Sequence, residues 1–353
     1  MFSSKSRGPY TRMYLTHIDE DGNDSPAIFI DNAAAANRAV NIPEFVNIPA
    51  DGMVKIATPA VDMYKQFDHA TELSEKGQDA AAIAEWTALA ANHPDDARIH
   101  SNLGAELART GKYQDAVLHY EKALELNPQY NAVRGPLAGT LMKLGRMDDA
   151  LEQYQIAVET YPGSAELHNS YGSALARRGR VEDAAGEFTK ATELNPRFAE
   201  AQNNLGIALA RQGRLDDAKE RFAKAVALNP RSAEAHNNLG IALLSDDPNA
   251  LPEKAEEEFK AAIAINGRYA DAQDNLGTLY RQQGNAGQAE IFFRRAIDSD
   301  VRFMKGYLNL ADLLASQSKF ADADLVLEKA LKIDPANREV QGFRDKLSAA
   351  RAQ

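Results

Sequence analysis

A pattern of 34 residues recurs along this chain, and the stretch from Ala199 to Ser232 shows it most clearly. Counting from Ala199, apolar residues stand at positions 7 and 11, and again at positions 20, 24 and 27. Both sets have the spacing of side chains that share one face of an α-helix. Gly213, at position 15, separates the two sets, and glycine readily adopts the positive φ that a chain reversal needs. Each unit is therefore predicted to be a hairpin of two helices.

Other residues of the unit mark the ends of these helices. Asp216 and Asp217 suit the N-terminus of the second helix, where acidic side chains are favoured. Pro230 ends that helix, because the residue before a proline is biased away from the helical conformation. Gly206 and Ala218 are small, which predicts that the two helices cross closely at this point. Since one hairpin cannot cover its own apolar face, neighbouring units are expected to stack.

The pattern repeats eight times, with no linkers between the units. The predicted units are residues 63–96, 97–130, 131–164, 165–198, 199–232, 233–269, 270–303 and 304–337. The sixth unit departs from the pattern, because a three-residue insertion with two prolines, in the segment from Ser245 to Pro252, replaces its turn. Residues 338–353 are predicted to form a capping helix, since Val340, Phe343 and Leu347 share one face and solenoid ends need a cover.

The period, the alternation of small and large residues and the terminal proline resemble the motif of the tetratricopeptide repeat (TPR) family. The resemblance implies an all-α fold, a right-handed α-solenoid of about eight helical hairpins. It also implies that the first helix of each unit lines a concave groove. By this resemblance, the chain is a non-catalytic scaffold for protein–protein interaction that binds an extended peptide or a partner subunit in the groove.

Residues 1–60 have a different character and are predicted to be a small β-containing segment. Tyr10 to Ile18 is rich in β-forming side chains, Asp19 to Gly22 is a turn signal, and Ala27 to Ile30 is predicted as the returning strand. The segment resembles the end of a TolB-like β-propeller, with Asn41 to Phe45 as the exit segment. A lone hairpin is marginal in water, so these strands need something with which to pair.

This segment leaves three interpretations open beside a loosely ordered tail. The strands pair with the solenoid, or they dock on a neighbouring copy and make a self-assembling, head-to-tail structural subunit. Alternatively, the chain is the regulatory tail of an exported propeller–TPR protein whose upstream part is not included. The chain as given is expected to be cytoplasmic, and a fragment of an exported protein would be periplasmic or extracellular. The absence of cysteine fits an exported bacterial protein.

Composition excludes several classes of function. The net charge of −11 argues against general binding of nucleic acids, which requires a basic surface. With no cysteine, the chain has no disulfide framework and no thiolate metal site. The sequence contains no glycine-rich phosphate loop, nucleophile elbow or metal-ligand spacing, so no enzymatic activity, metal or cofactor is predicted. No apolar run approaches the roughly 20 residues that span a bilayer.

Position 6 of the first helix carries asparagine in five units. In the family, positions 2, 5, 6, 9, 12 and 13 of each unit are implied to face the groove. An amide side chain has donors and acceptors, so a row of amides suits the N–H and C=O groups of an extended peptide. The predicted binding residues of this kind are Asn102, Asn204, Asn238, Asn275 and Asn309 at position 6, with Asn169, Asn203 and Asn237 at position 5.

These units resemble those of O-linked N-acetylglucosamine transferase, whose position-6 asparagines are implied to hold substrate chains in this way. Pro136 and Ser170 interrupt the row here, so units five to eight are predicted to be the binding half. The alternative is that the asparagines only cap or solvate the helix surface. Asparagine is a poor residue in the middle of a helix, so its recurrence at one position favours binding.

Two charged stripes and three apolar residues complete the predicted surface. The basic stripe at position 13 is Arg109, Lys143, Arg177 and Arg211, and the acidic stripe at position 2 is Glu166, Glu200, Glu234 and Asp271. The stripes either orient a bound ligand or simply follow the helix macrodipole, which favours each sign at that end of the helix. The apolar residues are Ile207, Ile241 and Leu244. His100, His168 and His236, all at position 4, are predicted to make helix contacts and not to bind metal.

Overall fold

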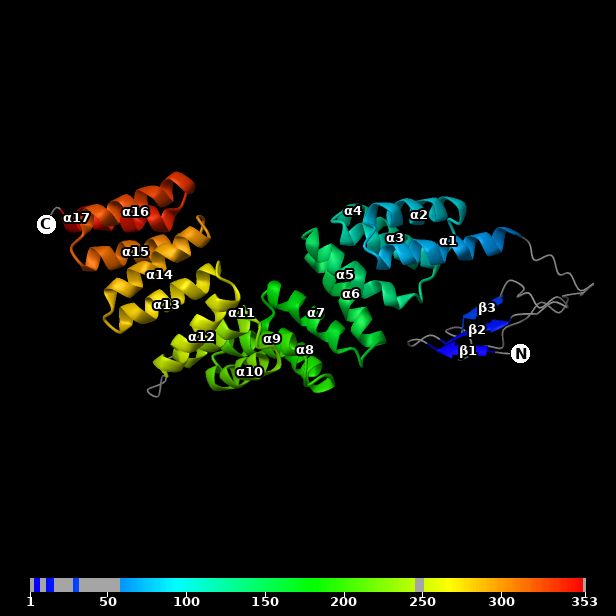
Figure 1. The fold of residues 1–353 in the computed structure, drawn as a ribbon, viewed down its shortest axis with the longest axis horizontal. Coiled ribbons are helices and arrows are strands. Elements are labelled where there is room, and N and C mark those ends of the chain that lie inside the picture. Colours follow the sequence, from blue (N-terminus) through cyan, green and yellow to red (C-terminus); the bar gives the residue numbers. More distant parts are fainter. Residues whose placement is uncertain (1–2, 7–10, 16–27, 32–57, 245–250, 352–353) are drawn as a thin grey trace, which may run out of the picture. The chain divides into compact units, whose positions relative to one another are not determined.

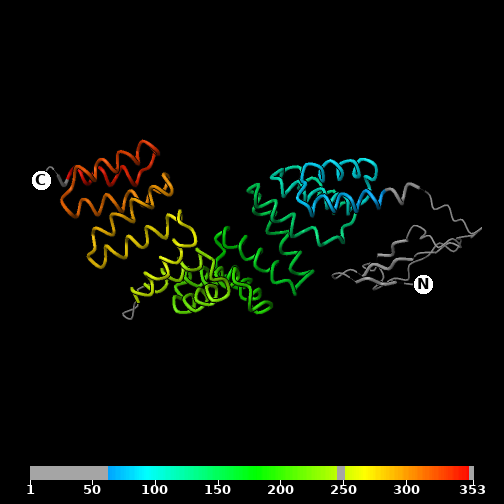
Figure 2. The backbone as a smooth tube through the Cα atoms, viewed as in Figure 1, coloured from blue at the N-terminus to red at the C-terminus, as the bar shows by residue number. Residues whose placement is uncertain are grey.

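The computed structural model describes residues 3–6, 11–15, 28–31, 58–244 and 251–351 (Figure 1). The chain divides into two units, residues 1–65 and 66–353. The second is an all-α repeat solenoid in which each helix packs against the next one along the chain (Figure 2). None of the helices described combines the length and the apolar character that crossing a membrane requires.

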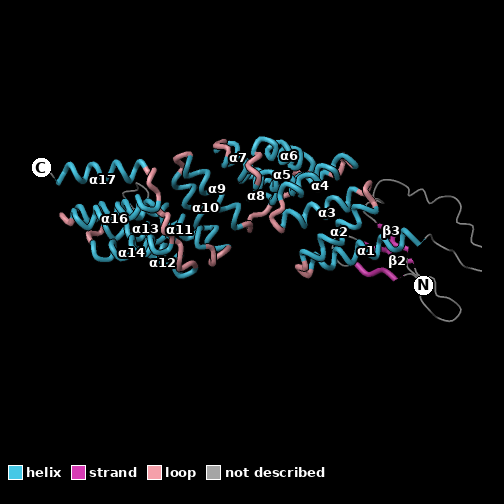
Figure 3. Tube along the Cα trace, turned by 90° about the horizontal axis from the view of Figure 1, so that it is seen from above, coloured by secondary structure: helices cyan, strands magenta, loops and turns pink. Residues whose placement is uncertain are grey.

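Seventeen α-helices lie in the described residues, and short loops join successive helices of the solenoid wherever the whole connection is described (Figure 3). They are α1 (Thr58–Glu75), α2 (Asp79–Asn92), α3 (Ala97–Arg109), α4 (Tyr113–Leu126), α5 (Arg134–Lys143), α6 (Met147–Thr160), α7 (Ala165–Arg177), α8 (Val181–Leu194), α9 (Ala199–Arg211), α10 (Leu215–Leu228), α11 (Ala233–Leu244), α12 (Pro252–Ile265), α13 (Ala270–Gln282), α14 (Ala286–Ser299), α15 (Met304–Ser316), α16 (Phe320–Ile333) and α17 (Arg338–Arg351). A short 3-10 helix, η1 (Asn131–Val133), precedes α5.

The N-terminal segment contains three short strands, β1 (Ser3–Ser6), β2 (Thr11–Leu15) and β3 (Ile28–Asp31). They form an antiparallel sheet in the order β1-β2-β3, with Met13 opposite Ser4 on one side and Ile30 on the other. The predicted propeller exit, Asn41 to Phe45, lies outside the described residues. So do residues 245–250 of the predicted insertion in the sixth unit.

Glycine at position 15 reverses the chain between the two helices of a unit, as predicted. Gly213 has a φ of 77°, and its N–H donates to the carbonyl of Ala210. The next N–H, of Arg214, donates to the carbonyl of Leu209 at 3.0 Å, which completes a Schellman cap on α9. In the eighth unit, Ser318 takes the place of this glycine and still has a φ of 60°.

The two helices of a unit cross closely at position 8. This confirms the prediction that Gly206 is small because the helices meet at this point. A Cβ added to Gly206 would lie 2.6 Å from Cε1 of Phe222, and one added to Gly240 would lie 2.6 Å from Cε1 of Phe259. The atoms that fill this space belong to the aromatic ring at position 24. A side chain at position 8 would therefore have to displace a buried ring.

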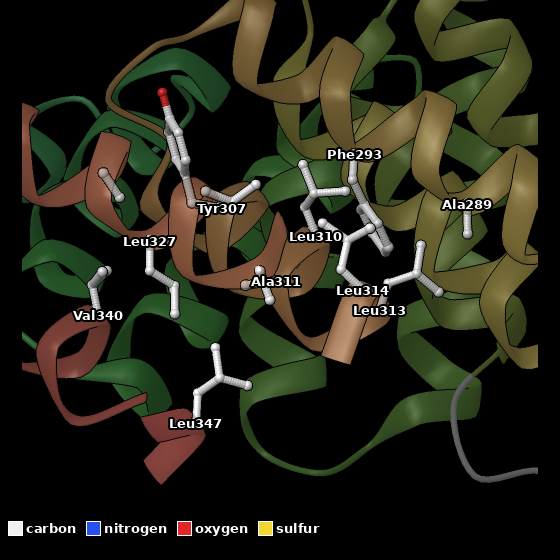
Figure 4. Packing of buried hydrophobic residues seen from close by; sticks show 13 residues of the cluster. Ala289, Phe293, Tyr307, Leu310, Ala311, Leu313, Leu314, Leu327, Val340 and Leu347 are labelled. Atoms are coloured by element: carbon white, nitrogen blue, oxygen red, sulfur yellow. The ribbon is translucent and has the colours of Figure 1, made fainter. Parts of the chain in front are cut away.

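The apolar core runs through the repeats, and its C-terminal part is shown in Figure 4. Phe293 of α14 is fully buried beside Leu310 and Leu314 of α15. Helix α17 buries Val340 and Leu347 against the same cluster, with Phe343 partly buried between them. The polar side of α17 is left to face solvent, so this helix covers the last apolar face of the stack.

Candidate functional site

The asparagines at position 5 are buried. Asn169, Asn203 and Asn237 expose only 4%, 6% and 4% of their surface. The prediction that position 5 points into an open groove is therefore wrong. The first helices of adjacent units approach each other on this side, so that each buried amide reaches the first helix of the following unit.

Each buried amide holds two side chains of the next unit. Oδ1 of Asn203 accepts from Nδ2 of Asn238 at 3.0 Å, and Nδ2 of Asn203 donates to Oε1 of Glu234 at 3.1 Å. Glu234 and Asn238 are one helical turn apart on α11, so a single amide bridges both of them. We call this arrangement an amide clasp. A second clasp joins Asn169 to Glu200 at 3.0 Å and to Asn204 at 2.9 Å.

The last two junctions vary this arrangement. Asn237 accepts from Nδ2 of Asn275 at 2.9 Å. Between units seven and eight, Asp274 stands at position 5 and accepts from Nδ2 of Asn309 at 2.7 Å. The ammonium group of Lys305, at position 2 of the eighth unit, lies 2.9 Å from the other oxygen of Asp274. The acidic residue at position 5 is thus matched by a basic residue at position 2, where units four to six have glutamate.

The clasp also sets the orientation of the asparagines at position 6. Asn204, Asn238, Asn275 and Asn309 are half-buried, and each turns its Nδ2 toward the preceding unit. Oδ1 of Asn204, Asn238 and Asn309 takes no part in these bonds, whereas Oδ1 of Asn275 accepts from Nζ of Lys305 at 3.4 Å. An amide oxygen has two lone pairs, so each of these oxygens has capacity to accept a hydrogen bond from a ligand.

The first units lack the clasp. Asn102 is half-buried in α3, but position 5 of the preceding unit is Phe67, whose ring lies 5.6 Å from the guanidinium carbon of Arg98. Pro136 and Ser170 occupy position 6 in the next two units, as the sequence indicated. Because a proline is tolerated only near a helix start, η1 takes the place of the first turn and α5 begins at Arg134.

Four predicted residues meet in one cavity between α7 and α9. The cavity has a volume of about 460 Å³, and Asn204, Ile207, Arg177 and Arg211 are among its lining residues. Apolar atoms of Val181 and Phe188 contribute to its wall, together with the carboxylate of Glu200. The cavity therefore combines two cationic groups, one carboxylate, one oriented amide and an apolar surface.

The remaining predicted residues have separate surroundings. Arg109 donates to Asp79 at 2.5 Å and also to Glu106, and these hydrogen bonds, the one to Glu106 above all, raise the pKa of Arg109. The guanidinium group of Arg109 is thus already paired with two carboxylates of the protein. Lys143 is exposed at the end of α5. Ile241 is 45% exposed on α11, and Leu244 is half-buried at the end of that helix.

The histidines at position 4 make helix contacts, as predicted. Nδ1 of His168 lies 2.6 Å from Oε2 of Glu187 on α8, and its Nε2 lies 3.0 Å from the carbonyl of Pro162. His236 makes the same two contacts, with Glu258 and Pro230. These rings tie the first helix of a unit to its second helix and to the preceding loop. Over the described ranges, no group of three or more potential ligands (His, Cys, Asp or Glu) is placed to hold a metal.

Four models described as the tetratricopeptide repeat match this sequence. They cover residues 97–130, 137–197, 182–218, 203–247, 270–299 and 305–337. Together the matches span more than half of the chain. No curated protein matches the chain.

Solved structures with the same fold are similar to this chain. A tetratricopeptide repeat protein from Parabacteroides merdae is 18% identical, with 71% of this chain and 98% of that chain covered and a TM-score of 0.56. The Cut9–Hcn1 hetero-tetramer of APC/C is 16% identical, with 80% and 55% covered and a TM-score of 0.57. Pseudomonas aeruginosa pilF is 20% identical, with 61% and 97% covered and a TM-score of 0.52.

At these identities, the likeness establishes the fold alone. The repeating sequence, the hairpins with their glycine turns and the matches to the family models show that this chain belongs to the tetratricopeptide repeat family.

Proposed function

We propose that this protein is a scaffold for protein–protein interaction that holds an extended segment of a partner along the first helices of units five to eight. Stacked helical repeats commonly serve as extended binding surfaces, because each unit adds another helix to the same face. Asparagines at position 6 would meet the partner's backbone, and Ile207, Ile241 and Leu244 would contact its apolar side chains.

The observation that carries this proposal is the fixed orientation of the position-6 amides. In the clasps, Nδ2 of Asn204 and Asn238 is already bonded to the preceding unit. The amide is therefore held in place before a ligand arrives, so less conformational entropy is lost on binding. Its oxygen, which takes no part in the clasp, would accept from a backbone N–H, which every residue except proline offers. Such a row would bind a backbone with little regard for its side chains.

Because of the clasps, removal of the position-6 amides is expected to lower the stability of the protein as well as its binding. Replacing Asn204, Asn238 and Asn275 together with alanine leaves three buried acceptors, on Asn169, Asn203 and Asn237, without their donors. An unsatisfied buried acceptor costs about 1–3 kcal/mol, so we expect this position-6 variant to melt below the wild type. We also expect it to lose binding to an array of immobilised random peptides, measured at a temperature where circular dichroism shows it folded.

A matched control removes the same hydrogen bonds by replacing the buried partner, at position 5, in each of them. The variant with Asn169, Asn203 and Asn237 replaced by alanine breaks the same three bonds and also those to Glu200 and Glu234. It should lose at least as much stability and yet keep more of its peptide binding, because the position-6 amides remain. Wild-type binding by the position-6 variant would show that these amides do not hold the partner.

A further inference from the structure

The cavity between α7 and α9 contains two arginines whose charges the protein itself does not use. Arg177 and Arg211 are exposed at its edge, and neither makes a hydrogen bond or an ion pair with a carboxylate in the part of the chain that the structure describes. Other arginines near the C-terminal ends of first helices are paired. Arg109 bonds to Asp79, and Arg281 of α13 lies 2.6 Å from Asp312. Units four and five thus bring two guanidinium groups without a carboxylate partner among the described residues to the lining of one cavity.

Glu200 and Asn204, nearer the start of α9, bring acceptor oxygens to the cavity, and both side chains already form hydrogen bonds with Asn169. The carboxylate of Glu200 accepts from Nδ2 of Asn169 at 3.0 Å, and the amide of Asn204 donates to the same asparagine at 2.9 Å. Oε2 of Glu200 and Oδ1 of Asn204 remain as acceptors. Val181, Phe188 and Ile207 also line the cavity. The cavity therefore combines the donors of two arginines, at the ends of α7 and α9, with two acceptor oxygens nearer the start of α9 and with an apolar surface.

We propose that this cavity is a subsite for an acidic side chain, Asp or Glu, of the bound partner segment. The proposal rests on the function proposed above and names the chemistry of the partner at one place on the surface. The guanidinium groups of Arg177 and Arg211 present planar forks of N–H donors that match the two oxygens of a carboxylate. The methylene groups of the partner's acidic side chain lie on the apolar surface of the cavity. The backbone N–H of the same partner residue donates to Oδ1 of Asn204.

The net charge of the whole chain does not favour an acidic partner segment, so the preference has to arise within the cavity. With a net charge of −11, the protein repels acidic partners at a distance. A preference for an acidic segment therefore has to come from contacts within the cavity, and exposed charges are largely screened beyond about 8 Å at physiological salt. Glu200 in the wall also disfavours a polyanion such as a nucleic acid, which carries closely spaced charges along its length.

An array of random peptides of about twelve residues tests this assignment. Each peptide is made in three versions, in which one central residue is Glu, Gln or Lys. For peptides that the wild type binds, we expect the Glu version to bind about tenfold more tightly than the Gln version, and the Lys version to bind weakest. In the double variant Arg177→Gln/Arg211→Gln, the Glu and Gln versions should bind equally well.

The matched control is the double variant Arg197→Gln/Arg231→Gln, which changes the net charge by the same amount at two exposed positions outside the cavity. It should keep the preference of the wild type for Glu. A preference that survives in the Arg177→Gln/Arg211→Gln variant, or that is missing from the wild type, overturns the carboxylate subsite and leaves the proposed function intact. If the wild type binds no peptide in any version, the proposed function fails, and the subsite fails with it.

Discussion

Replacing Phe293 with alanine will lower the free energy of unfolding by about 3–5 kcal/mol, as is usual for a large aromatic residue removed from a core. Its ring is fully buried and packs against the backbone at Gly277. A Cβ added to Gly277 would lie only 2.8 Å from Cδ1 of Phe293. It also packs beside Leu310 and Leu314 of the next unit (Figure 4). The variant therefore loses contacts within the seventh unit and across its junction with the eighth.

The loss should be local, because each unit of a solenoid contacts only its neighbours. Hydrogen exchange should rise most in α13 to α16 and least in α3 and α4, and denaturant unfolding gives the total loss. Ile291→Ala is the matched control, since Ile291 lies on the same helix and is 45% exposed. A Phe293→Ala variant that is no less stable than Ile291→Ala would contradict the stacked core described above.

Reversing the charge at Lys305 will destabilise the junction between units seven and eight by about 3 kcal/mol. Asp274 exposes none of its surface, and the ammonium group of Lys305 lies 2.9 Å from its carboxylate. Among the described residues, Lys305 is the only cation that forms an ion pair with Asp274. Lys305→Glu removes this cation and places a second negative charge beside the buried carboxylate. Thermal unfolding followed by circular dichroism measures the effect.

A second substitution should restore most of this loss. In the double variant Asp274→Asn/Lys305→Glu, the junction has the residue types of the amide clasp that joins Asn203 to Glu234 and Asn238. We therefore expect a coupling free energy of about 2 kcal/mol or more in the double-mutant cycle. Additive effects of the two substitutions would show that positions 5 and 2 do not act as a pair across the junction.

The hairpins and their turns were predictable because their causes are local. The positive φ of Gly213 and the end of α10 before Pro230 follow from the conformational preferences of single residues. The close approach at Gly206 follows from one spacing within one unit. Such features depend on residues that are near each other in the sequence, so a repeated pattern reveals them.

The role of position 5 was not predictable in the same way, because it depends on contacts between units. Positions 5 and 6 are adjacent in the sequence, and helical periodicity alone places both near the groove side of the first helix. The approach of the following helix decides that Asn203 is buried while Asn204 is half-buried. A signal was present in the sequence, since Asp274 at position 5 is followed one unit later by Lys305 at position 2. This pairing links two different repeat positions in two successive units, so the residues found at any one position do not reveal it.

The cavity shows a similar division. The sequence indicated that Arg177 and Arg211 share a stripe with Arg109, but it did not distinguish between them. The structure does so, because Arg109 is held by Asp79 and Glu106. Whether an arginine is available to a ligand depends on acidic residues of other helices, and a one-dimensional pattern does not contain that information.

Site-specific photo-cross-linking tests most directly whether a partner chain lies along the first helices. A benzophenone amino acid is placed at Ile241 on the first helix α11 or, as the control, at Ile291 on the second helix α14, two positions that are each 45% exposed. Irradiation of cells that produce the protein should cross-link position 241, and not position 291, to another polypeptide. Cross-links from position 291 with none from position 241 would contradict the account.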